Sequence, residues 1–159
     1  MERNLKDLGT GMRDFIWVLD PEKDSLRETL QRIEAFGNTL FSDTQTRFSA
    51  SMDINSLEKI SLDIKDKRHL LLIFKEAMNN TLKYAGASEA KLTAKIEGIN
   101  FVVHYTDNGK GFDTEDKASG YGLNNMRSRA EESGASLTIH STKERGTAIT
   151  FRKEIHPAG

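Results

Sequence analysis

The chain has 159 residues and a nearly balanced charge, with 23 lysines and arginines against 24 aspartates and glutamates. This balance gives no basic surface for a polyphosphate backbone, so we expect no nucleic-acid partner. The length suits one domain, and 36% hydrophobic with 30% charged residues is typical of a folded, water-soluble protein. The absence of cysteine excludes disulfides and thiolate metal sites, and no apolar stretch approaches the roughly 20 residues of a membrane span. We therefore expect a cytoplasmic domain.

Two helices are predicted at the start of the chain, separated at Asp20-Pro21. In the first, apolar residues recur at steps of three and four and form one stripe: Leu5, Leu8, Met12, Phe15, Ile16 and Leu19. Proline ends this pattern because it lacks an N–H group and restricts the residue before it. Asp24 or Ser25 can then cap a second helix that ends near Leu40. Its core-facing residues are expected to be Leu26, Leu30, Ile33 and Phe36.

The remainder of the chain mixes strand and helix patterns. Alternation of apolar and polar side chains predicts strands at 46–52, 90–96, 101–107, 135–141 and 147–155. Residues 65–85 lack proline and glycine and are predicted to form the longest helix, with Gly86 at its end. A shorter helix is expected at 124–133, closed by Gly134. We predict a two-layer α/β sandwich with a mixed, mostly antiparallel sheet packed on helices, preceded by an extra N-terminal helix.

Three polar residues of the long helix fall on one stripe at its edge. Successive helical residues advance about 100°, which places Glu76, Asn80 and Lys83 together, beside Ala77 and Thr81. A purely structural interpretation is a solvated face on which Glu76 pairs with Lys83. The alternative is a site at which a carboxylate, an amide and an ammonium group meet a ligand.

A carboxylate is predicted to point into the core where the strand FVVHYTD ends. Period-two counting puts Asp107 on the same side as Phe101, Val103 and Tyr105. A buried carboxylate needs a hydrogen-bond donor, because an unpaired one is costly. That donor can be a nearby backbone or threonine group, or it can be the amino group of a ligand.

Two glycine pairs follow this carboxylate. Gly109 and Gly111 let the backbone approach a ligand closely or adopt positive φ. Gly120 and Gly122 precede the shorter helix, and the unpaired N–H groups at the start of a helix favour anions such as phosphates. Each pair alone also fits an ordinary turn, so neither decides the function by itself.

The combination of four motifs indicates the function. EAMNNTLKYA, DNGKGFD, SGYGLNNMRSRA and RGTAITF occur in this order and resemble the N, G1, G2 and G3 boxes of the GHKL ATPases, which share the Bergerat fold. Residues 121–130 resemble sensor histidine kinases that partner response regulators of the helix-turn-helix output type. Residues 15–26 resemble the junction in those kinases between the second dimerisation helix and the catalytic domain. The resemblance divides the chain into 1–20, a remnant of that helix, and 21–159, the ATP-binding catalytic domain.

The resemblance implies that the domain binds Mg-ATP and donates its γ-phosphoryl group to a histidine in two-component signal transduction. Asn80 would hold Mg²⁺ against the phosphates, and Glu76, one turn earlier, would order water near that metal. Lys83 and Tyr84 would face the phosphates and the ribose, although a histidine is more usual than Tyr84 at that position. The expected catalytic residues are Glu76, Asn80 and Lys83.

The remaining positions implied by the resemblance bind the base and the phosphates. Asp107 would accept a hydrogen bond from the adenine amino group, with support from Thr147 through water. Residues 112–120 would form a short ATP lid. The glycines that bend around the base and the backbone groups that meet the phosphates would be Gly109, Gly111, Gly120, Gly122 and Leu123.

No histidine of this chain resembles the phosphate acceptor of such kinases, which an acidic residue usually follows. The four histidines are His69, His104, His140 and His156, and we expect them on the surface or on strand faces. The acceptor is then outside this sequence, and the chain is expected to be a fragment of a longer, homodimeric kinase. Its implied partners are the dimerisation and phosphoacceptor domain of that kinase and a response regulator. An N-terminal region outside this sequence could anchor that kinase to a membrane.

Two other functions fit the same superfamily. The domain could be an ATP hydrolase or an anti-sigma-type protein-serine kinase with Glu76 as base, which the predicted helix remnant and the RSRA stretch disfavour. It could also be an interaction module with a degenerate nucleotide site. The intact motif residues disfavour that interpretation: Glu76, Asn80, Asp107, Gly109, Gly111 and Gly122.

Overall fold

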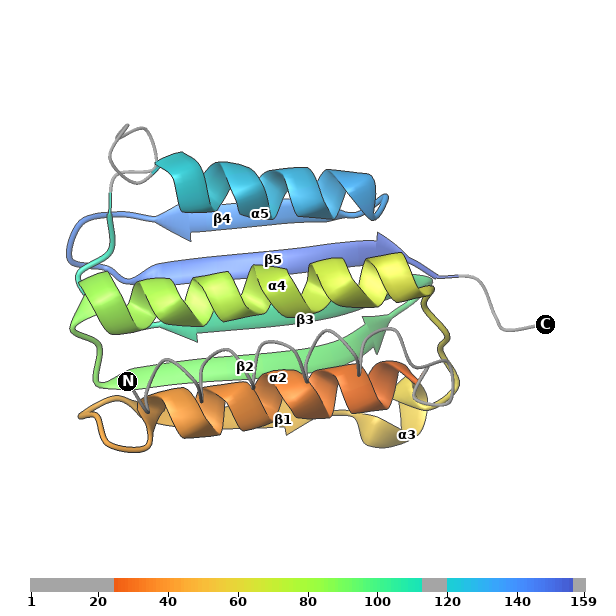
Figure 1. The fold of residues 1–159 in the computed structure, drawn as a ribbon, viewed down its shortest axis with the longest axis horizontal. Helices are drawn as coiled ribbons and strands as arrows, with labels where there is room; N and C mark the ends of the chain where they lie inside the picture. Colours follow the sequence, from red (N-terminus) through yellow and green to blue (C-terminus); the bar gives the residue numbers. More distant parts are fainter. Residues whose placement is uncertain (1–24, 113–119, 156–159) are drawn as a thin grey trace, which may run out of the picture.

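The computed structural model describes residues 25–112 and 120–155 (Figure 1). The predicted helix before Pro21 and most of the predicted ATP lid lie outside these ranges, so both remain predictions. None of the helices in the described ranges has the length and apolar character needed to cross a membrane.

A five-stranded sheet forms one layer of the fold. Its strands are β1 (Arg47–Met52), β2 (Glu89–Glu97), β3 (Asn100–Asp107), β4 (Ser136–Ser141) and β5 (Thr147–Glu154). Their spatial order is β1-β2-β3-β5-β4, with β1 parallel to β2 and the other pairs antiparallel. This arrangement confirms the predicted mixed, mostly antiparallel sheet. It also places β3 and β5 side by side at the centre.

Helices form the second layer, on one face of the sheet (Figure 1). They are α2 (Leu26–Phe41), α4 (Ile64–Asn80) and α5 (Gly120–Glu132), with a short helix α3 (Ile54–Leu57) after β1. The Ser25 side chain caps α2 by accepting a hydrogen bond from the Glu28 N–H, one of the two caps predicted. Asp63 caps α4 in the same way through the Asp66 N–H. Side-chain acceptors at these positions satisfy N–H groups that a helix start leaves free.

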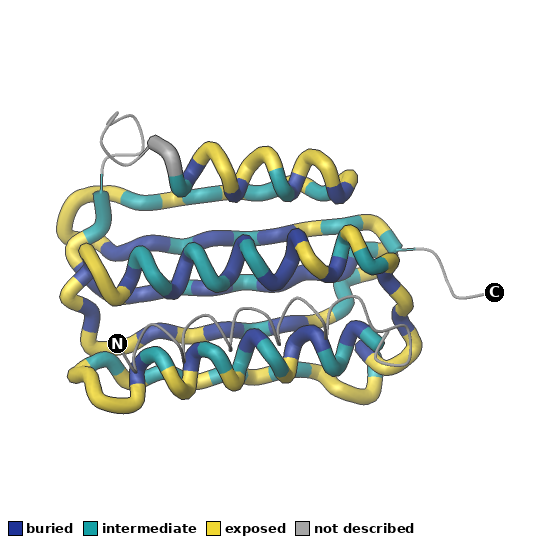
Figure 2. The backbone as a smooth tube through the Cα atoms, viewed as in Figure 1, coloured by how far each residue is buried: buried dark blue, intermediate teal, exposed yellow. Residues whose placement is uncertain are grey.

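The core lies between the two layers, where buried residues follow the strands and the inward faces of the helices (Figure 2). Leu26, Leu30 and Ile33 are fully buried on α2, as the periodicity predicted. On the sheet, the predicted alternation is confirmed by Ala90, Leu92 and Ala94 of β2 and by Phe101, Val103 and Tyr105 of β3. Sequence alternation therefore located the layer interface correctly.

The predicted helix over 65–85 is wrong in one respect, because its last turn is not α-helical. Residues Thr81–Ala85 form a π-helical turn, η2, which Gly86 ends with φ +58°. The Thr81 N–H lies against the carbonyls of both Ala77 and Met78, and its hydroxyl oxygen lies within hydrogen-bonding distance, 3.2 Å, of the Ala77 carbonyl. Such side-chain bonding to the preceding turn competes with regular helical pairing, and single π turns are frequent at functional sites.

Two smaller features of the helices also differ from the prediction. The helix α5 begins at Gly120, four residues before the expected start at Asn124. The short helix α3 was not predicted, because four residues carry no measurable apolar period.

One histidine lies in neither of the environments expected for it. His69 is buried between α4 and α5, where its Nε2 is 3.0 Å from a carboxylate oxygen of Glu132. Burial lowers the pKa of His69 more than this carboxylate raises it, so the ring is neutral at pH 7. The other described histidines, His104 and His140, lie on strand faces as predicted.

Candidate functional site

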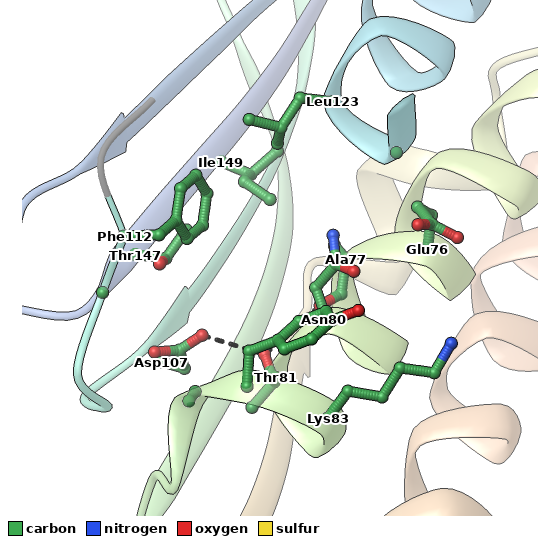
Figure 3. A pocket seen from close by; sticks show the side chains of 14 residues that line it. Glu76, Ala77, Asn80, Thr81, Lys83, Asp107, Phe112, Leu123, Thr147 and Ile149 are labelled. Carbon is green, nitrogen blue, oxygen red and sulfur yellow. Dashed lines mark hydrogen bonds between the residues drawn. The ribbon is translucent and has the colours of Figure 1, made fainter. Parts of the chain in front are cut away.

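A cleft of about 350 Å³ opens between the C-terminal end of α4, the turn η2, the start of α5 and the ends of β3 and β5 (Figure 3). Most of the residues predicted to bind a ligand line it: Glu76, Asn80, Lys83, Tyr84, Asp107, Gly111, Gly122, Leu123 and Thr147. The fold thus brings together residues that are far apart in the sequence. A volume of this size is typical of a small-molecule site.

The edge of α4 supplies the polar wall of the cleft. Glu76 and Asn80 are half-buried and one helical turn apart, while Lys83 and Tyr84 are exposed on η2. No ion pair joins Glu76 to Lys83 in the described part of the chain, so the purely structural interpretation of this stripe is not supported. The carboxylate and the ammonium group both remain open to a ligand.

Asp107 lies at the base of the cleft with both carboxylate oxygens held. Its Oδ2 accepts a hydrogen bond from the Thr81 hydroxyl over 2.9 Å, and its Oδ1 accepts one from the Gly109 N–H over 2.9 Å. Both donors considered from the sequence, a threonine and a backbone group, are therefore present. A carboxylate offers about four acceptor positions, and these two bonds occupy only half of them. Asp107 can accept a further hydrogen bond from a ligand in the cleft.

Thr147 lies directly beside this carboxylate. It is the β-ladder partner of Asp107, and its hydroxyl is 2.9 Å from the Ser141 hydroxyl. No direct hydrogen bond joins Thr147 to Asp107 among the described residues, so its predicted support through water stays a prediction.

Glycines allow close approach at two places in the cleft. A Cβ added to Gly122 would collide with the Glu76 carboxylate and would lie 3.6 Å from the Asn80 side-chain nitrogen. A side chain at position 122 would therefore displace the Glu76 carboxylate from its place beside the start of α5. Gly111 has φ +68°, and a Cβ there would collide with the Thr142 carbonyl. The positive φ predicted for this glycine pair is confirmed at Gly111.

The structure does not bring every predicted residue to the cleft wall. Gly109 packs instead against Ala85, whose Cβ would lie 2.5 Å from a Cβ added to the glycine. Its contribution to the site is the N–H that holds Asp107, rather than a bend around a ligand. Gly120 begins α5, and its predicted contact with the phosphates stays a prediction.

Phe112, the first residue of the predicted ATP lid, also lines the cleft. Sequence reasoning gave no ligand-binding role to four other lining residues: Ala77, Thr81, Ala85 and Ile149. A period count from the identified positions would have found two of them. Thr81 follows Ala77 by four residues on the face that meets Asp107, and Ile149 follows Thr147 by two on the same side of β5. In Figure 3, Phe112, Leu123 and Ile149 form an apolar side, opposite the polar ends of Glu76 and Asn80. The cleft can therefore hold a flat apolar ring system at one end and charged groups at the other.

The start of α5 adds donors to the charged end. The first four N–H groups of a helix have no partner within it, and the helix dipole favours negative charge there. In α5 these groups belong to residues 120–123, which include Gly122 and Leu123 of the cleft wall. Together with the ammonium group of Lys83, they give the cleft a wall suited to an anion.

Comparison with known proteins agrees with the family resemblance seen in the sequence motifs. Residues 65–157 match the family described as histidine kinase-, DNA gyrase B- and HSP90-like ATPases. The sensor histidine kinase LiaS of Bacillus subtilis is 36% identical over 99 residues, which are 62% of this chain and 27% of LiaS. The sensor protein VraS of Staphylococcus saprophyticus is 30% identical over 152 residues, which are 95% of this chain and 36% of VraS. The chain thus spans about a third of the length of these relatives.

The fold is also that of solved kinase structures. The histidine kinase domain of a blue-light activated kinase from Erythrobacter litoralis superimposes with a TM-score of 0.68 at 17% identity, covering 82% of this chain and 61% of that chain. The predicted Bergerat fold is confirmed. The chain belongs to the family of histidine kinase-, DNA gyrase B- and HSP90-like ATPases, as the ATPase domain of a sensor histidine kinase of the group that includes LiaS and VraS.

Proposed function

We propose that this domain binds Mg-ATP in the cleft and donates the γ-phosphoryl group to a histidine on another segment or chain. The observation that carries the proposal is the position of Asp107, a buried carboxylate with free acceptor capacity at the base of a cleft whose other end is lined by phosphate-binding groups. Adenine offers an amino group to such an acceptor and an apolar ring to Phe112 and Ile149. The triphosphate would extend toward Lys83 and the start of α5.

The remaining cleft residues have roles that follow from their chemistry. The backbone N–H groups of Gly122 and Leu123 would bind phosphate oxygens, and the Lys83 ammonium group would balance their charge. Tyr84 is 69% exposed and would cover the ribose at the mouth of the cleft. Phosphoryl transfer depends mainly on positioning and on stabilising charge, which these groups supply.

The residues also fit Mg²⁺, provided that the nucleotide completes its coordination. The described residues include no group of three or more His, Cys, Asp or Glu side chains that could hold a metal alone. Mg²⁺ usually takes one or two protein oxygens and fills its shell with phosphate oxygens and water. Asn80 would supply one oxygen, and Glu76, beside it under Gly122, would order the water. When bound, Mg²⁺ would neutralise charge on the phosphates.

The relatives support a histidine as the acceptor. LiaS and VraS are sensor proteins, whereas neither is described as an anti-sigma kinase or a hydrolase. In this proposal, residues 1–20 would belong to a dimerisation helix and residues 21–159 would form the ATP-binding domain. The implied partners are the phosphoacceptor domain of a homodimeric kinase and a response regulator.

Calorimetric titration tests nucleotide binding. We expect saturable binding of ATP that Mg²⁺ strengthens, because Asn80 and Glu76 contribute only when a metal links them to the phosphates. A chain that begins at Pro21 should bind equally well, since every lining residue in the described part of the chain follows that position. Absence of binding to the full chain would end the proposal, and weaker binding by the shortened chain would contradict the domain boundary.

Radiolabel transfer tests the acceptor. Incubation of the chain with ATP labelled at the γ position should leave no acid-labile phosphate on it, because no histidine here resembles an acceptor. Addition of the phosphoacceptor domain of the longer kinase should place the label on that domain. A labelled histidine in the chain itself would refute the assignment, as would label on a serine of the added domain.

A further inference from the structure

A chain of two buried hydroxyl groups leads from the core to the base of the cleft. The Tyr105 phenol oxygen is 2.6 Å from the Thr81 hydroxyl oxygen, which is in turn 2.9 Å from Oδ2 of Asp107. Tyr105 is fully buried, and Thr81 is 2% exposed. Asp107 and Thr81 line the cleft, whereas Tyr105 lies behind them and is not part of the cleft lining (Figure 3).

The positions of the hydroxyl hydrogens in the series Tyr105–Thr81–Asp107 follow from the chemistry of the three side chains. A carboxylate only accepts, and Oδ2 of Asp107 at 2.9 Å lies closer to the Thr81 hydroxyl than the Ala77 carbonyl does at 3.2 Å, so the single hydroxyl hydrogen of Thr81 points at Asp107. The Tyr105 phenol then has to donate to the Thr81 oxygen, and no other acceptor for it occurs among the described residues. Burial raises the pKa of Tyr105 well above its ordinary value, which keeps the phenol protonated as a donor. Both bonds therefore run in one direction, toward the carboxylate.

The result is a carboxylate fixed in orientation. The Thr81 hydroxyl holds Oδ2, and the Gly109 N–H holds Oδ1 from the other side. A donor that is itself polarised by a second hydroxyl binds more strongly. Asp107 therefore meets a ligand as an acceptor only, and rotation of its carboxylate would break one of these bonds.

We propose that Thr81 and Tyr105 are positioning residues that make the cleft select a 6-amino purine over a 6-oxo purine. The inference rests on the proposed binding of adenine to Asp107. A 6-amino group donates to the fixed carboxylate, whereas a 6-oxo group presents a second acceptor to it. Without the Thr81 hydroxyl, the carboxylate could turn toward the adjacent ring N–H of a 6-oxo purine, and the selectivity would fall.

Titration of ATP and ITP into four chains tests this assignment, because these nucleotides differ at the 6 position and in the adjacent ring N–H. The chains are the wild type, Thr81→Val, Thr81→Ser and Tyr105→Phe. Thr81→Val should weaken ATP binding about tenfold and leave ITP binding within about twofold, so the selectivity falls about tenfold. Thr81→Ser restores the hydroxyl and should restore the selectivity. Tyr105→Phe removes only the polarising hydroxyl and should lower the selectivity by a few fold.

Thr29→Val is the matched control. Thr29 is also fully buried, its hydroxyl has no hydrogen-bond partner in the described part of the chain, and it lies on α2 away from the cleft. This variant should change neither affinity. An equal loss for ATP and ITP in Thr81→Val would show a merely structural role and overturn the inference, as would unchanged selectivity.

Thermal melting shows whether each variant folds. If Thr81→Val does not fold, the Tyr105→Phe variant tests the inference in its place. An ATP-over-ITP selectivity of Tyr105→Phe equal to that of the wild type then overturns the inference. Failure of the proposed function looks different, because a wild-type chain that binds neither nucleotide would overturn both proposals. A wild type that binds ATP with selectivity that the variants retain would overturn this one alone.

Discussion

Replacement of Asp107 by asparagine is expected to weaken ATP binding about a hundredfold while the domain stays folded. The substitution keeps the shape of the side chain but turns one acceptor position into an N–H donor. That donor must face the Thr81 hydroxyl, the Gly109 N–H or the adenine amino group, each of which donates to the native carboxylate in the proposed complex. Loss of a charged hydrogen bond together with an unsatisfied buried donor costs about 3 kcal/mol, which corresponds to roughly a hundredfold in affinity.

Calorimetry with Mg-ATP measures this effect, and Asp43→Asn is its control. Asp43 is exposed in the turn that follows α2, so the same chemical change there should leave the affinity unaltered. Thermal melting of both variants separates loss of the site from loss of the fold. An Asp107→Asn chain that melts as the wild type does and binds ATP within about threefold would remove the main support for adenine recognition by this residue.

The layer architecture could be predicted from the sequence because it depends on local patterns. Alternation along β2 and β3 places one set of side chains in the core, and the burial of Leu92 and Val103 follows that count. The strand order β1-β2-β3-β5-β4 was not available from those patterns, because pairing depends on contacts between distant segments.

The π turn at the end of α4 could not be predicted for a related reason. Residues 81–85 have the composition of an ordinary helix, and nothing local distinguishes a π turn from an α turn. In the structure, the Thr81 hydroxyl bonds to Tyr105 and Asp107 on β3, so its environment is set by a strand far along the chain. The same contact explains why Thr81 was missed as a site residue.

Most of the residues that line the cleft were predicted, but the hydrogen bonds that hold Asp107 in place were not. Asp107 was found because strand alternation points a carboxylate into an apolar core, which is a conflict visible in the sequence. Gly109 was identified correctly as a residue needed beside it, but for a different reason. Its N–H holds the carboxylate and its missing side chain makes room for Ala85, two contacts that only the folded chain reveals.

Replacement of Asn80 by alanine should abolish the strengthening of ATP binding by Mg²⁺. Asn80 is half-buried in the cleft, and the Glu76 carboxylate and Gly122 lie beside it, so its amide oxygen can meet a metal between the helix edge and the phosphates. Alanine removes that oxygen without disturbing α4, because alanine is the better helix former. The affinity measured with Mg²⁺ should fall to the level measured with EDTA, a loss of about 2 kcal/mol or some thirtyfold.

Asn79→Ala is a closely matched control for this prediction. Asn79 precedes Asn80 on the same helix and is half-buried to a similar degree, but it does not line the cleft. Both substitutions change helix propensity equally, so any difference between them reports the position of the amide relative to the nucleotide. If Asn79→Ala lost the Mg²⁺ dependence, or if Asn80→Ala kept it, the metal would have to lie elsewhere. The proposed orientation of the triphosphate, from Asp107 toward the start of α5, would then be wrong, because the metal binds the phosphates and therefore marks their position.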